Sequence, residues 1–274
     1  MLNVKNLSFN YGKTRIFKGF NLDIAEKEVT LITGINGVGK STLLRLMAGV
    51  LQPAAGEIRF HEKMGDDPRQ HIGFISDTPS LYESMTVGSA IDFHKSVYKI
   101  AKFDDSLLKR TKVDHLRKVK ELSLGQRVIL HLNLILSANP KLLLIDEVIH
   151  SIDVYLRGIF LKELIKLLSE KEVTVVFVNL NFRDIENIVD RVILLKNGEI
   201  AVDEEIEALK SKVKKITSAA RPEGLPVLFE VDFSQHTEFF VYPFKEEYSR
   251  QIEGELVDLD LTAIVNAFIG GEYV

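Results

Sequence analysis

The stretch GINGVGKST at residues 34 to 42 has the residue types and the spacing of a loop that binds phosphate groups. Its glycines allow the backbone to curl so that successive amide groups point inward at phosphate oxygens. Lys40 is expected to reach the β and γ phosphates, Ser41 to ligate Mg²⁺, and Thr42 to support the α phosphate. A glycine-rich turn that merely joins a strand to a helix is the alternative, and the complete match argues against it. The predicted cradle comprises Gly34, Asn36, Gly37, Val38, Gly39, Lys40, Ser41 and Thr42.

Two carboxylates, Asp146 and Glu147, follow the apolar run LLLI at 142 to 145. The end of a buried strand is where phosphoryl transfer needs an Asp that organises Mg²⁺ and a Glu that activates water. We predict that Asp146 contacts Mg²⁺ directly or through one of its ligands, and that Glu147 is the general base. By itself, such a pair more often only ends a strand. Its occurrence together with GINGVGKST favours the catalytic interpretation.

A second anion-binding pattern lies in ELSLGQRVILHLNLILSANP, at 121 to 140. Ser123 can cap a helix in this stretch, and the first amides of that helix, with the flexible Gly125 among them, can bind an anion. One nucleotide does not need two such sites from a single chain.

Apolar patterns predict the elements that position these residues. Three continuous apolar runs are typical of strands buried on both faces: VTLIT at 29–33, KLLLI at 141–145 and VTVVFV at 173–178. A helix-like stretch, YLRGIFLKELIKLLSE, separates the last two runs, and the order strand, helix, strand predicts a parallel sheet.

From Thr86 to about Leu122 the pattern becomes helical and charged, which indicates a helical insertion. Thr86 is its expected N-cap, and Phe93, Val97 and Ile100 form a sparse apolar stripe.

The pattern of apolar and polar residues changes beyond about residue 205. After a Lys-rich, helix-like stretch, VLFEVDFS alternates apolar and polar residues, and EFFVYPF follows a polar turn, so a hairpin is predicted. The tail DLDLTAIVNAFIGG has helical spacing, with Asp260 able to cap the helix and Gly270 able to end it. These elements indicate a small accessory domain.

Composition excludes several classes of protein. The 274 residues are 46% hydrophobic, carry a formal net charge of -4 and include no cysteine. Disulfide frameworks and thiolate metal sites are therefore excluded, and a general nucleic-acid binder is disfavoured. No secretory signal is visible, and every apolar stretch is shorter than the roughly 18 residues that cross a bilayer. We expect a cytoplasmic protein that needs a partner for any membrane role.

From residue 1 to about 203, the order and spacing of these motifs resemble the ATP-binding cassette (ABC) family, in which the LSGGQ signature of one protomer closes on ATP held by the other. The resemblance implies ATP and Mg²⁺ as ligands, with Ser123, Gly125 and Gln126 facing the nucleotide of the second protomer. It also implies that Tyr11 stacks on adenine, that Asp77 stands at the Gln of the Q-loop, where it contacts the metal and the reacting groups, and that Asp153 is the Asp of the D-loop.

The implied fold is α/β: a P-loop NTPase of the ABC type with a small α+β accessory domain. The nucleotide-binding domain is expected at 1–204, its helical subdomain at about 86–138, and the accessory domain at 205–274.

One departure from the family pattern bears on the rate of hydrolysis. Aligned without gaps, Leu180 falls on the family's switch His, so the polar contact to the γ phosphate is missing. On a strand, Asn179 and Asn181 point away from the direction of residue 180, which makes them poor substitutes. Val148 in place of Pro and Leu124 in place of Gly are further departures. Slowed hydrolysis is the resulting expectation.

The resemblance leaves three hypotheses. The first is the ATPase of an ABC-2-type exporter, working as a homodimer under integral membrane subunits at the inner face of the cell membrane. In this hypothesis, the residues from Asp77 to Thr86 and the helical insertion form the groove that receives a coupling helix of a membrane subunit. In the second, the chain is a poorly hydrolysing heterodimer partner of another ABC ATPase. A soluble ATP-driven clamp on nucleic acid is the third, and the acidic charge disfavours it. The transported substrate is chosen by another chain.

Overall fold

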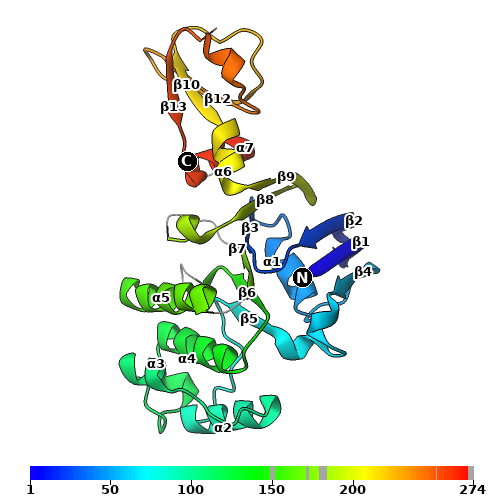
Figure 1. Cartoon of the computed structure of the whole chain (residues 1–274), viewed down its shortest axis with the longest axis vertical. Coiled ribbons are helices and arrows are strands. Elements are labelled where there is room, and N and C mark those ends of the chain that lie inside the picture. The colour runs from blue at the N-terminus through cyan, green and yellow to red at the C-terminus, as the bar shows by residue number, and fades with distance from the viewer. Residues whose placement is uncertain (149–151, 171–172, 179–183, 251, 271–274) are drawn as a thin grey trace. The chain divides into compact units, whose positions relative to one another are not determined.

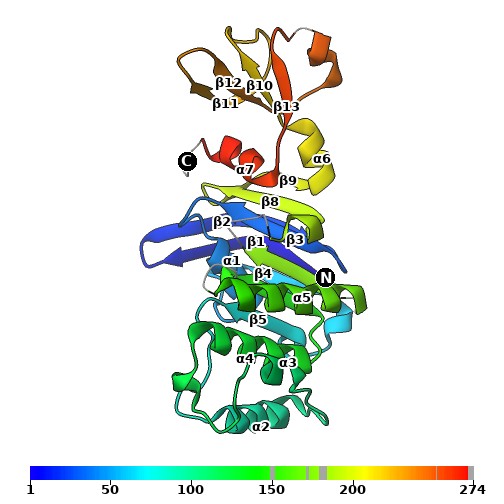
Figure 2. The same ribbon diagram turned by 90° about the vertical axis from the view of Figure 1, so that its left-hand side faces the viewer.

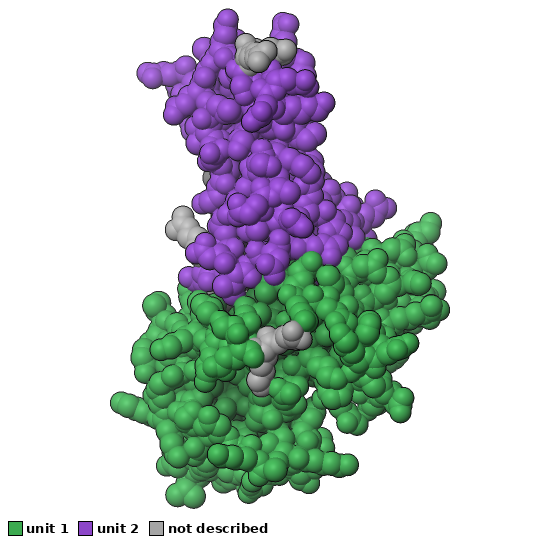
Figure 3. Space-filling model, viewed as in Figure 1, with its two compact units in different colours: residues 1–30, 39–179 green, residues 31–38, 180–274 purple. Residues whose placement is uncertain are grey.

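The structure is a computed structural model that describes residues 1–148, 152–170, 173–178, 184–250 and 252–270. Its contacts divide the chain into two compact units, residues 1–30 with 39–179 and residues 31–38 with 180–274 (Figure 3). Leu180, Asn179 and Asn181 lie outside the described residues.

The first unit holds one antiparallel sheet and three parallel strands of a six-stranded sheet (Figure 1). The antiparallel sheet has the order β2-β1-β4, formed by β1 (Leu2–Tyr11), β2 (Thr14–Ile24) and β4 (Ala55–Phe60). The parallel strands are β5 (Ile72–Ser76), β6 (Leu142–Asp146) and β7 (Thr174–Val178). Ser76 lies opposite Asp146, and Asp146 opposite Val178, so the carboxyl ends of these strands are level.

The predicted parallel sheet is confirmed, as are its buried strands. Every residue of β6 and β7 is buried, which explains why their sequences are continuously apolar rather than alternating. β3 (Val29–Gly34) is also fully buried, and it passes from the first unit into the second after Thr30. α1 (Lys40–Met47) begins directly after the phosphate loop.

The helical part of the first unit contains α2 (Val87–Tyr98), α3 (Ser106–Arg110), α4 (Leu124–Ser137) and α5 (Val154–Glu170). α4 packs against the other three, as Figures 1 and 2 show. Thr86 caps α2 as predicted, by accepting a hydrogen bond from the amide of Ser89 at 3.1 Å. Short 3₁₀ turns lie between β4 and β5, at Glu62–Met64 and Pro68–His71, and between α3 and α4, at Val119–Glu121.

The predicted apolar stripe of α2 does not face the core. Phe93 and Val97 are 46% and 56% exposed, whereas Val87, Ala90 and Ile91 are buried. Helical spacing identified the helix correctly but did not identify its buried face. α2 ends at Tyr98 because Lys99 adopts the left-handed conformation, with φ of 54°.

The second unit continues from a 3₁₀ turn at Glu186–Ile188 into the antiparallel pair β8 (Arg191–Lys196) and β9 (Glu199–Glu205), and then into α6 (Ile206–Lys212). A four-stranded sheet follows with the order β11-β12-β10-β13. Its strands are β10 (Lys214–Ser218), β11 (Val227–Asp232), β12 (Thr237–Val241) and β13 (Glu255–Asp258), with a 3₁₀ turn at Glu246–Arg250.

Two predictions for this unit are confirmed. β11 and β12 form the expected hairpin. α7 (Leu261–Ile269) is capped by Asp260, which accepts a hydrogen bond from the amide of Ala263 at 2.8 Å, and it ends at Gly270, with φ of 74°. The sheet has its own core of Ile216, Phe239, Val241 and Phe244. A domain boundary at 204/205 stays a prediction, because the contacts group β8 and β9 with the residues that follow them.

None of the helices within the described ranges has the length and apolar character that a membrane span requires.

Candidate functional site

The phosphate loop requires glycine at several positions. Gly34, Gly37 and Gly39 have φ of 139°, 80° and 113°, values that side chains rarely adopt. A Cβ atom on Gly39 would lie 2.6 Å from Ile16 Cγ2 and 2.7 Å from Phe17 Cζ. The glycines therefore give the backbone the curl that the sequence predicted, and the close packing of Gly39 is a further reason for glycine there.

Gly39→Ala is expected to destabilise the fold by about 1–3 kcal/mol, because alanine is strained at this φ and its methyl group meets the ring of Phe17. Urea unfolding measures the loss. Gly158→Ala in α5 is the matched control, since a Cβ at that position would meet no heavy atom within 4 Å and helical alanine is favourable. A Gly39→Ala chain as stable as the control would contradict the account of the loop.

Lys40, Ser41 and Asp146 lie together at the start of α1 and the end of β6. Ser41 Oγ donates a hydrogen bond to Asp146 Oδ1 at 2.7 Å. Lys40 is only 4% exposed, and burial lowers its pKa, although the charges of Glu147 and Asp146 oppose this shift. Burial also raises the pKa of Asp146, with the Ser41 hydrogen bond acting in the opposite direction. The buried ammonium of Lys40 therefore favours an anionic ligand, and the buried carboxylate of Asp146 favours a cation.

These residues fit a nucleotide with Mg²⁺. A serine hydroxyl and a carboxylate 2.7 Å apart supply the hard oxygen ligands that Mg²⁺ prefers. Ser41 and Asp146 would hold the ion, and Lys40 would contact the phosphates. When bound, Mg²⁺ neutralises charge that develops on the β and γ phosphate oxygens.

Glu147 is held by its backbone at the end of β6. Its φ is 50°, in the left-handed region that is uncommon for a residue other than glycine. Its amide donates a hydrogen bond to the carbonyl of Val178 at 2.9 Å, so the end of β7 fixes it. Such strained backbone recurs where a side chain must be held in one direction for function. The role of Glu147 as general base is our proposal.

The signature residues form a second group, at the N-terminus of α4. Ser123 Oγ accepts a hydrogen bond from the amide of Gln126 at 3.2 Å, and Gln126 Oε1 accepts one from the amide of Ser123 at 3.2 Å. This reciprocal pair is a capping box, and it confirms Ser123 as the predicted cap. Gly125 is buried, and a Cβ there would lie 2.5 Å from Leu156 Cδ1. Gly125 therefore also has a packing role that the sequence did not reveal.

Asp153 belongs to this second group. Its Oδ1 accepts a hydrogen bond from the amide of Leu156 at 3.0 Å, so it caps α5, and its Oδ2 would lie 3.5 Å from a Cβ on Gly125. The structure thus brings the signature and the D-loop aspartate together within the first unit. Their contact with the nucleotide of a second protomer remains a proposal.

Of the remaining predicted residues, Tyr11, Asn36 and Asp77 are exposed, whereas Val38 and Thr42 are buried. Asp77 directly follows β5, whose last residue lies opposite Asp146, and its charge contributes to the raised pKa of Asp146. Tyr11 is 46% exposed, and its ring is nearly perpendicular to that of Phe9 with 4.9 Å between the ring centres, so the ring is accessible to a base. The roles of Asp77 and Tyr11 remain proposals.

Sequence reasoning missed Arg45. This residue lies one helical turn after Ser41 in α1, and its positive charge opposes the rise in the pKa of Asp146 that burial causes. The spacing i, i+4 along the predicted helix was the available signal.

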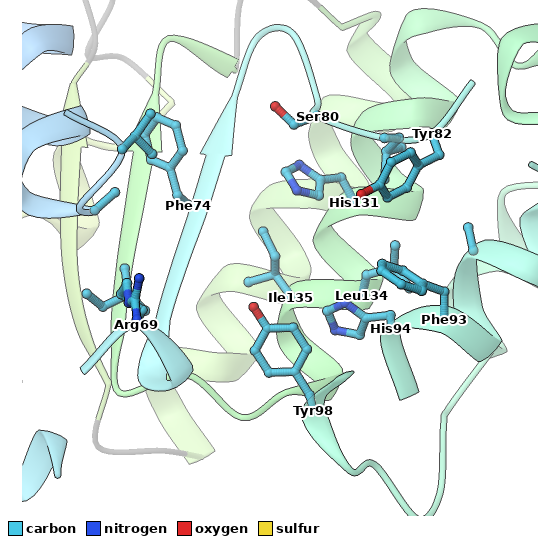
Figure 4. A pocket seen from close by; sticks show the side chains of 15 residues that line it. Arg69, Phe74, Ser80, Tyr82, Phe93, His94, Tyr98, His131, Leu134 and Ile135 are labelled. Carbon is cyan, nitrogen blue, oxygen red and sulfur yellow. The ribbon is translucent and has the colours of Figure 1, made fainter. Parts of the chain in front are cut away.

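Sequence reasoning also missed two histidines in a groove of about 360 Å³ in the first unit (Figure 4). His94 comes from α2 and His131 from α4, and aromatic side chains surround them. The ring of Tyr82 meets that of Phe93 edge-on at 5.5 Å, and the ring of Tyr98 lies 4.5 Å from that of His94. Helical spacing alone does not show that α2 and α4 bring their histidines to one groove.

Acid is expected to destabilise the protein through His131. Burial lowers the pKa of His131 from 6.5 to about 4, so between these values the unfolded chain binds more protons than the folded one. His131 therefore leaves the free energy of unfolding unchanged above pH 6.5 and lowers it as pH falls towards 4, by about 3 kcal/mol in total. His131→Leu should therefore flatten this part of the profile of unfolding free energy against pH. Equal slopes for the two proteins would contradict the burial of a neutral imidazole.

The chain is similar to several known proteins. Residues 17–150 match the family described as ABC transporter. A putative ABC transporter ATP-binding protein of Clostridium perfringens, CPE0195, is 30% identical over 236 residues, which cover 79% of this chain and 82% of that protein. A probable sulfate/thiosulfate import ATP-binding protein of Chlorella vulgaris, CysA, is 31% identical over 214 residues, with 72% and 88% covered.

Among solved structures, the ATP-binding cassette MJ0796, a dimer in a post-hydrolysis state bound to ADP and Pi, is 25% identical to this chain. The TM-score is 0.63, and the match covers 75% of this chain and 99% of that one. The predicted P-loop NTPase fold of the ABC type is thereby confirmed. This chain belongs to the ABC transporter family of ATP-binding proteins, which are ATPases that bind ATP with Mg²⁺.

Proposed function

We propose that this chain is the ATPase of an ABC-2-type exporter and that ATP closes two ATPase chains head to tail beneath integral membrane subunits. The dimer is supported by the presence in one chain of two groups whose chemistry suits phosphate. Lys40 and Ser41 form the first group, and the capped N-terminus of α4 at Ser123 forms the second. Because one nucleotide needs only the first group from a given chain, the second serves the nucleotide of its partner. The dimer of the similar cassette MJ0796 supports this arrangement.

Hydrolysis in this dimer is slow by our proposal. Lys40, Ser41, Asp146 and Glu147 supply the phosphate contacts, the metal ligands and the base. The sequence has Leu180 where the family has its switch His, and leucine can neither donate a hydrogen bond nor orient water. Loss of one such contact costs about 3 kcal/mol, or roughly a hundredfold in rate.

The exporter branch rests on two features of the chain. A separate sheet and helix follow β9, as in the independently encoded ATPases of ABC-2 exporters that the sequence resembles. Aromatic residues exposed around the groove of α2 and α4 offer a docking surface for the coupling helix of a membrane subunit. The chain then works at the cytoplasmic face of the membrane, without nucleic acid.

An importer is the second candidate, because the similar protein of Chlorella vulgaris is named for sulfate/thiosulfate import. Deleting the gene and measuring intracellular metabolites separates the two directions. Loss of an exporter raises the intracellular level of its substrate, whereas loss of an importer lowers it.

Purification of the tagged chain from detergent-solubilised membranes tests the proposed assembly. An integral membrane protein in stoichiometric amount is expected beside a single type of ATPase chain. A second, different ATPase would make the chain one half of a heterodimer. Nucleic acid without a membrane protein would contradict the proposal.

A further inference from the structure

We propose that the segment between α3 and α4 at residues 112–121, called the basic loop below, binds the surface of a bilayer that carries anionic lipid headgroups. Leu116 enters the interface, and the lysines around it contact the headgroups. The inference rests on the proposed function, because that function places this part of the chain beside a membrane, and it adds a contact with the lipid itself.

Positive charge is concentrated in the helical part of a chain that is acidic overall. Residues 86–138 contain 10 Lys and Arg but only 5 Asp and Glu, so their formal net charge is +5. Because the whole chain carries -4, the remaining residues carry -9. This distribution favours approach of the helical part, and not of the rest of the chain, to an anionic surface.

Three lysines of the basic loop are available to such a surface. They are exposed and form no ion pair within the described part of the chain: Lys112, Lys118 and Lys120. The two acidic residues of the loop bond to its backbone instead. Asp114 Oδ1 accepts a hydrogen bond from the amide of Leu116 at 2.9 Å, and Glu121 Oε2 accepts one from the amide of Lys118 at 3.2 Å. The lysine ammonium groups can therefore bind anions outside the chain.

Leu116 protrudes from the basic loop. It is 84% exposed, more than any other large apolar residue that the structure describes. Its neighbours are fixed to the start of α2. The amide of Val87 donates to the carbonyl of Arg117 at 2.9 Å, and the amide of Gly88 donates to that of His115 at 2.9 Å. A single exposed leucine is ordinary, but one whose flanking backbone is fixed and whose neighbours are cationic has the composition of an interfacial anchor.

The basic loop borders the groove that we assign to the membrane subunit. The amides of Val119 and Lys120 donate to the carbonyls of Met85 at 2.9 Å and Glu83 at 3.2 Å. Tyr82, directly before these two residues, lines the groove (Figure 4). A subunit seated in the groove continues into the bilayer, so the basic loop lies on the side of the chain that faces the lipid.

A bilayer suits Leu116 better than a protein partner does. A protein would need a hollow of its own to receive this protruding side chain, whereas the boundary between headgroups and acyl chains accepts an apolar side chain at any point. Lysine side chains can lie along apolar surface while their ammonium groups reach the headgroups. Because one leucine and three lysines bind weakly, the contact orients the chain at the membrane and does not anchor it alone.

Co-sedimentation of the full chain with lipid vesicles, in the absence of nucleotide, tests the inference. We expect binding to vesicles of phosphatidylcholine with about 30% phosphatidylglycerol, and none to phosphatidylcholine alone. Raising sodium chloride from about 0.1 M to about 0.5 M should release the chain, because salt screens the lysines. No membrane subunit is present, so the result does not depend on its identity or on the direction of transport.

Three variants locate the contact. Lys118→Gln and Lys120→Gln should each lower the partition coefficient about fivefold. Leu116→Ser should lower it about tenfold, and the high exposure of this residue keeps the substitution from disturbing the fold. Lys245→Gln makes the same change in net charge as either lysine variant. Its side chain is 60% exposed in the second unit, so it is the control and should bind as the unaltered chain does.

Several results would overturn the inference. Equal binding to both kinds of vesicle, or to neither, would remove the role of anionic lipid. Full binding by Leu116→Ser and Lys118→Gln would place the contact elsewhere. Release by inorganic phosphate, but not by sodium chloride of equal ionic strength, would indicate a site for a soluble anion.

The vesicle measurement and the purification from membranes fail separately. A chain that purifies with a membrane protein but binds no vesicle would overturn only this inference. A chain that binds anionic vesicles through the basic loop but purifies with no membrane protein would overturn the proposed function and leave the lipid contact supported.

Discussion

Leu180→His is expected to raise the rate of ATP hydrolysis about a hundredfold, because imidazole restores one polar contact to the γ phosphate that leucine cannot make. The gain should appear in kcat, measured by phosphate release at saturating ATP. ATP affinity should change little, since the loop at 34 to 42 and its lysine are untouched.

The neighbouring asparagines provide the control for this variant. Asn179→His and Asn181→His place the same imidazole on the two sequence neighbours of residue 180, which we predict to point elsewhere because successive side chains of a strand alternate in direction. Neither variant should gain more than a few-fold. If Leu180→His also shows no gain, another residue already supplies the missing contact, and the proposal of slow hydrolysis fails.

Glu147→Gln is expected to lower the rate of ATP hydrolysis by about 10²- to 10⁴-fold, the range that one general base contributes. Glutamine keeps the size of the side chain, and the backbone N–H of residue 147 still donates to the carbonyl of Val178, but the glutamine side chain cannot take a proton from water. ATP affinity should be retained. The measurement is best made in the Leu180→His background as well, where the higher starting rate widens the range that can be observed.

Glu207→Gln is the matched control for Glu147→Gln. The side chain of Glu207 is 83% exposed on α6 and forms a surface ion pair with Lys210 at 3.6 Å. Its loss should leave turnover unchanged. A Glu147→Gln chain that hydrolyses ATP at the unaltered rate would show that another group is the base.

The parts of the fold that the sequence predicted are those set by local physics. Continuous apolar runs identified the buried strands, and the side chains of Thr86, Ser123 and Asp260 identified three helix starts, because a cap depends only on residues within one turn. The phosphate loop and the pair at 146 and 147 were predictable for the same reason, since strand ends and glycine curls are local features.

The missed parts depend on contacts between distant residues. β10 begins with Lys214 and Lys215, and these lysines continue the Lys-rich, helix-like stretch that ends in α6, so the sequence gives no sign of a strand. Phe93 was expected on the apolar stripe of a packed helix, yet it lines an open groove. The meeting of His94 with His131, and the packing of Gly125 on Leu156, join elements whose proximity no spacing rule predicts.

The central claim, that two copies of this chain enclose ATP between the phosphate loop of one and Ser123 of the other, is tested most directly by the size of the Glu147→Gln chain in solution. Light scattering should show a dimer when ATP and Mg²⁺ are present and a monomer when they are absent, and Ser123→Arg should prevent the dimer while leaving ATP affinity unchanged. A Glu147→Gln chain that binds ATP with Mg²⁺ and remains a monomer at every concentration tested would contradict the account.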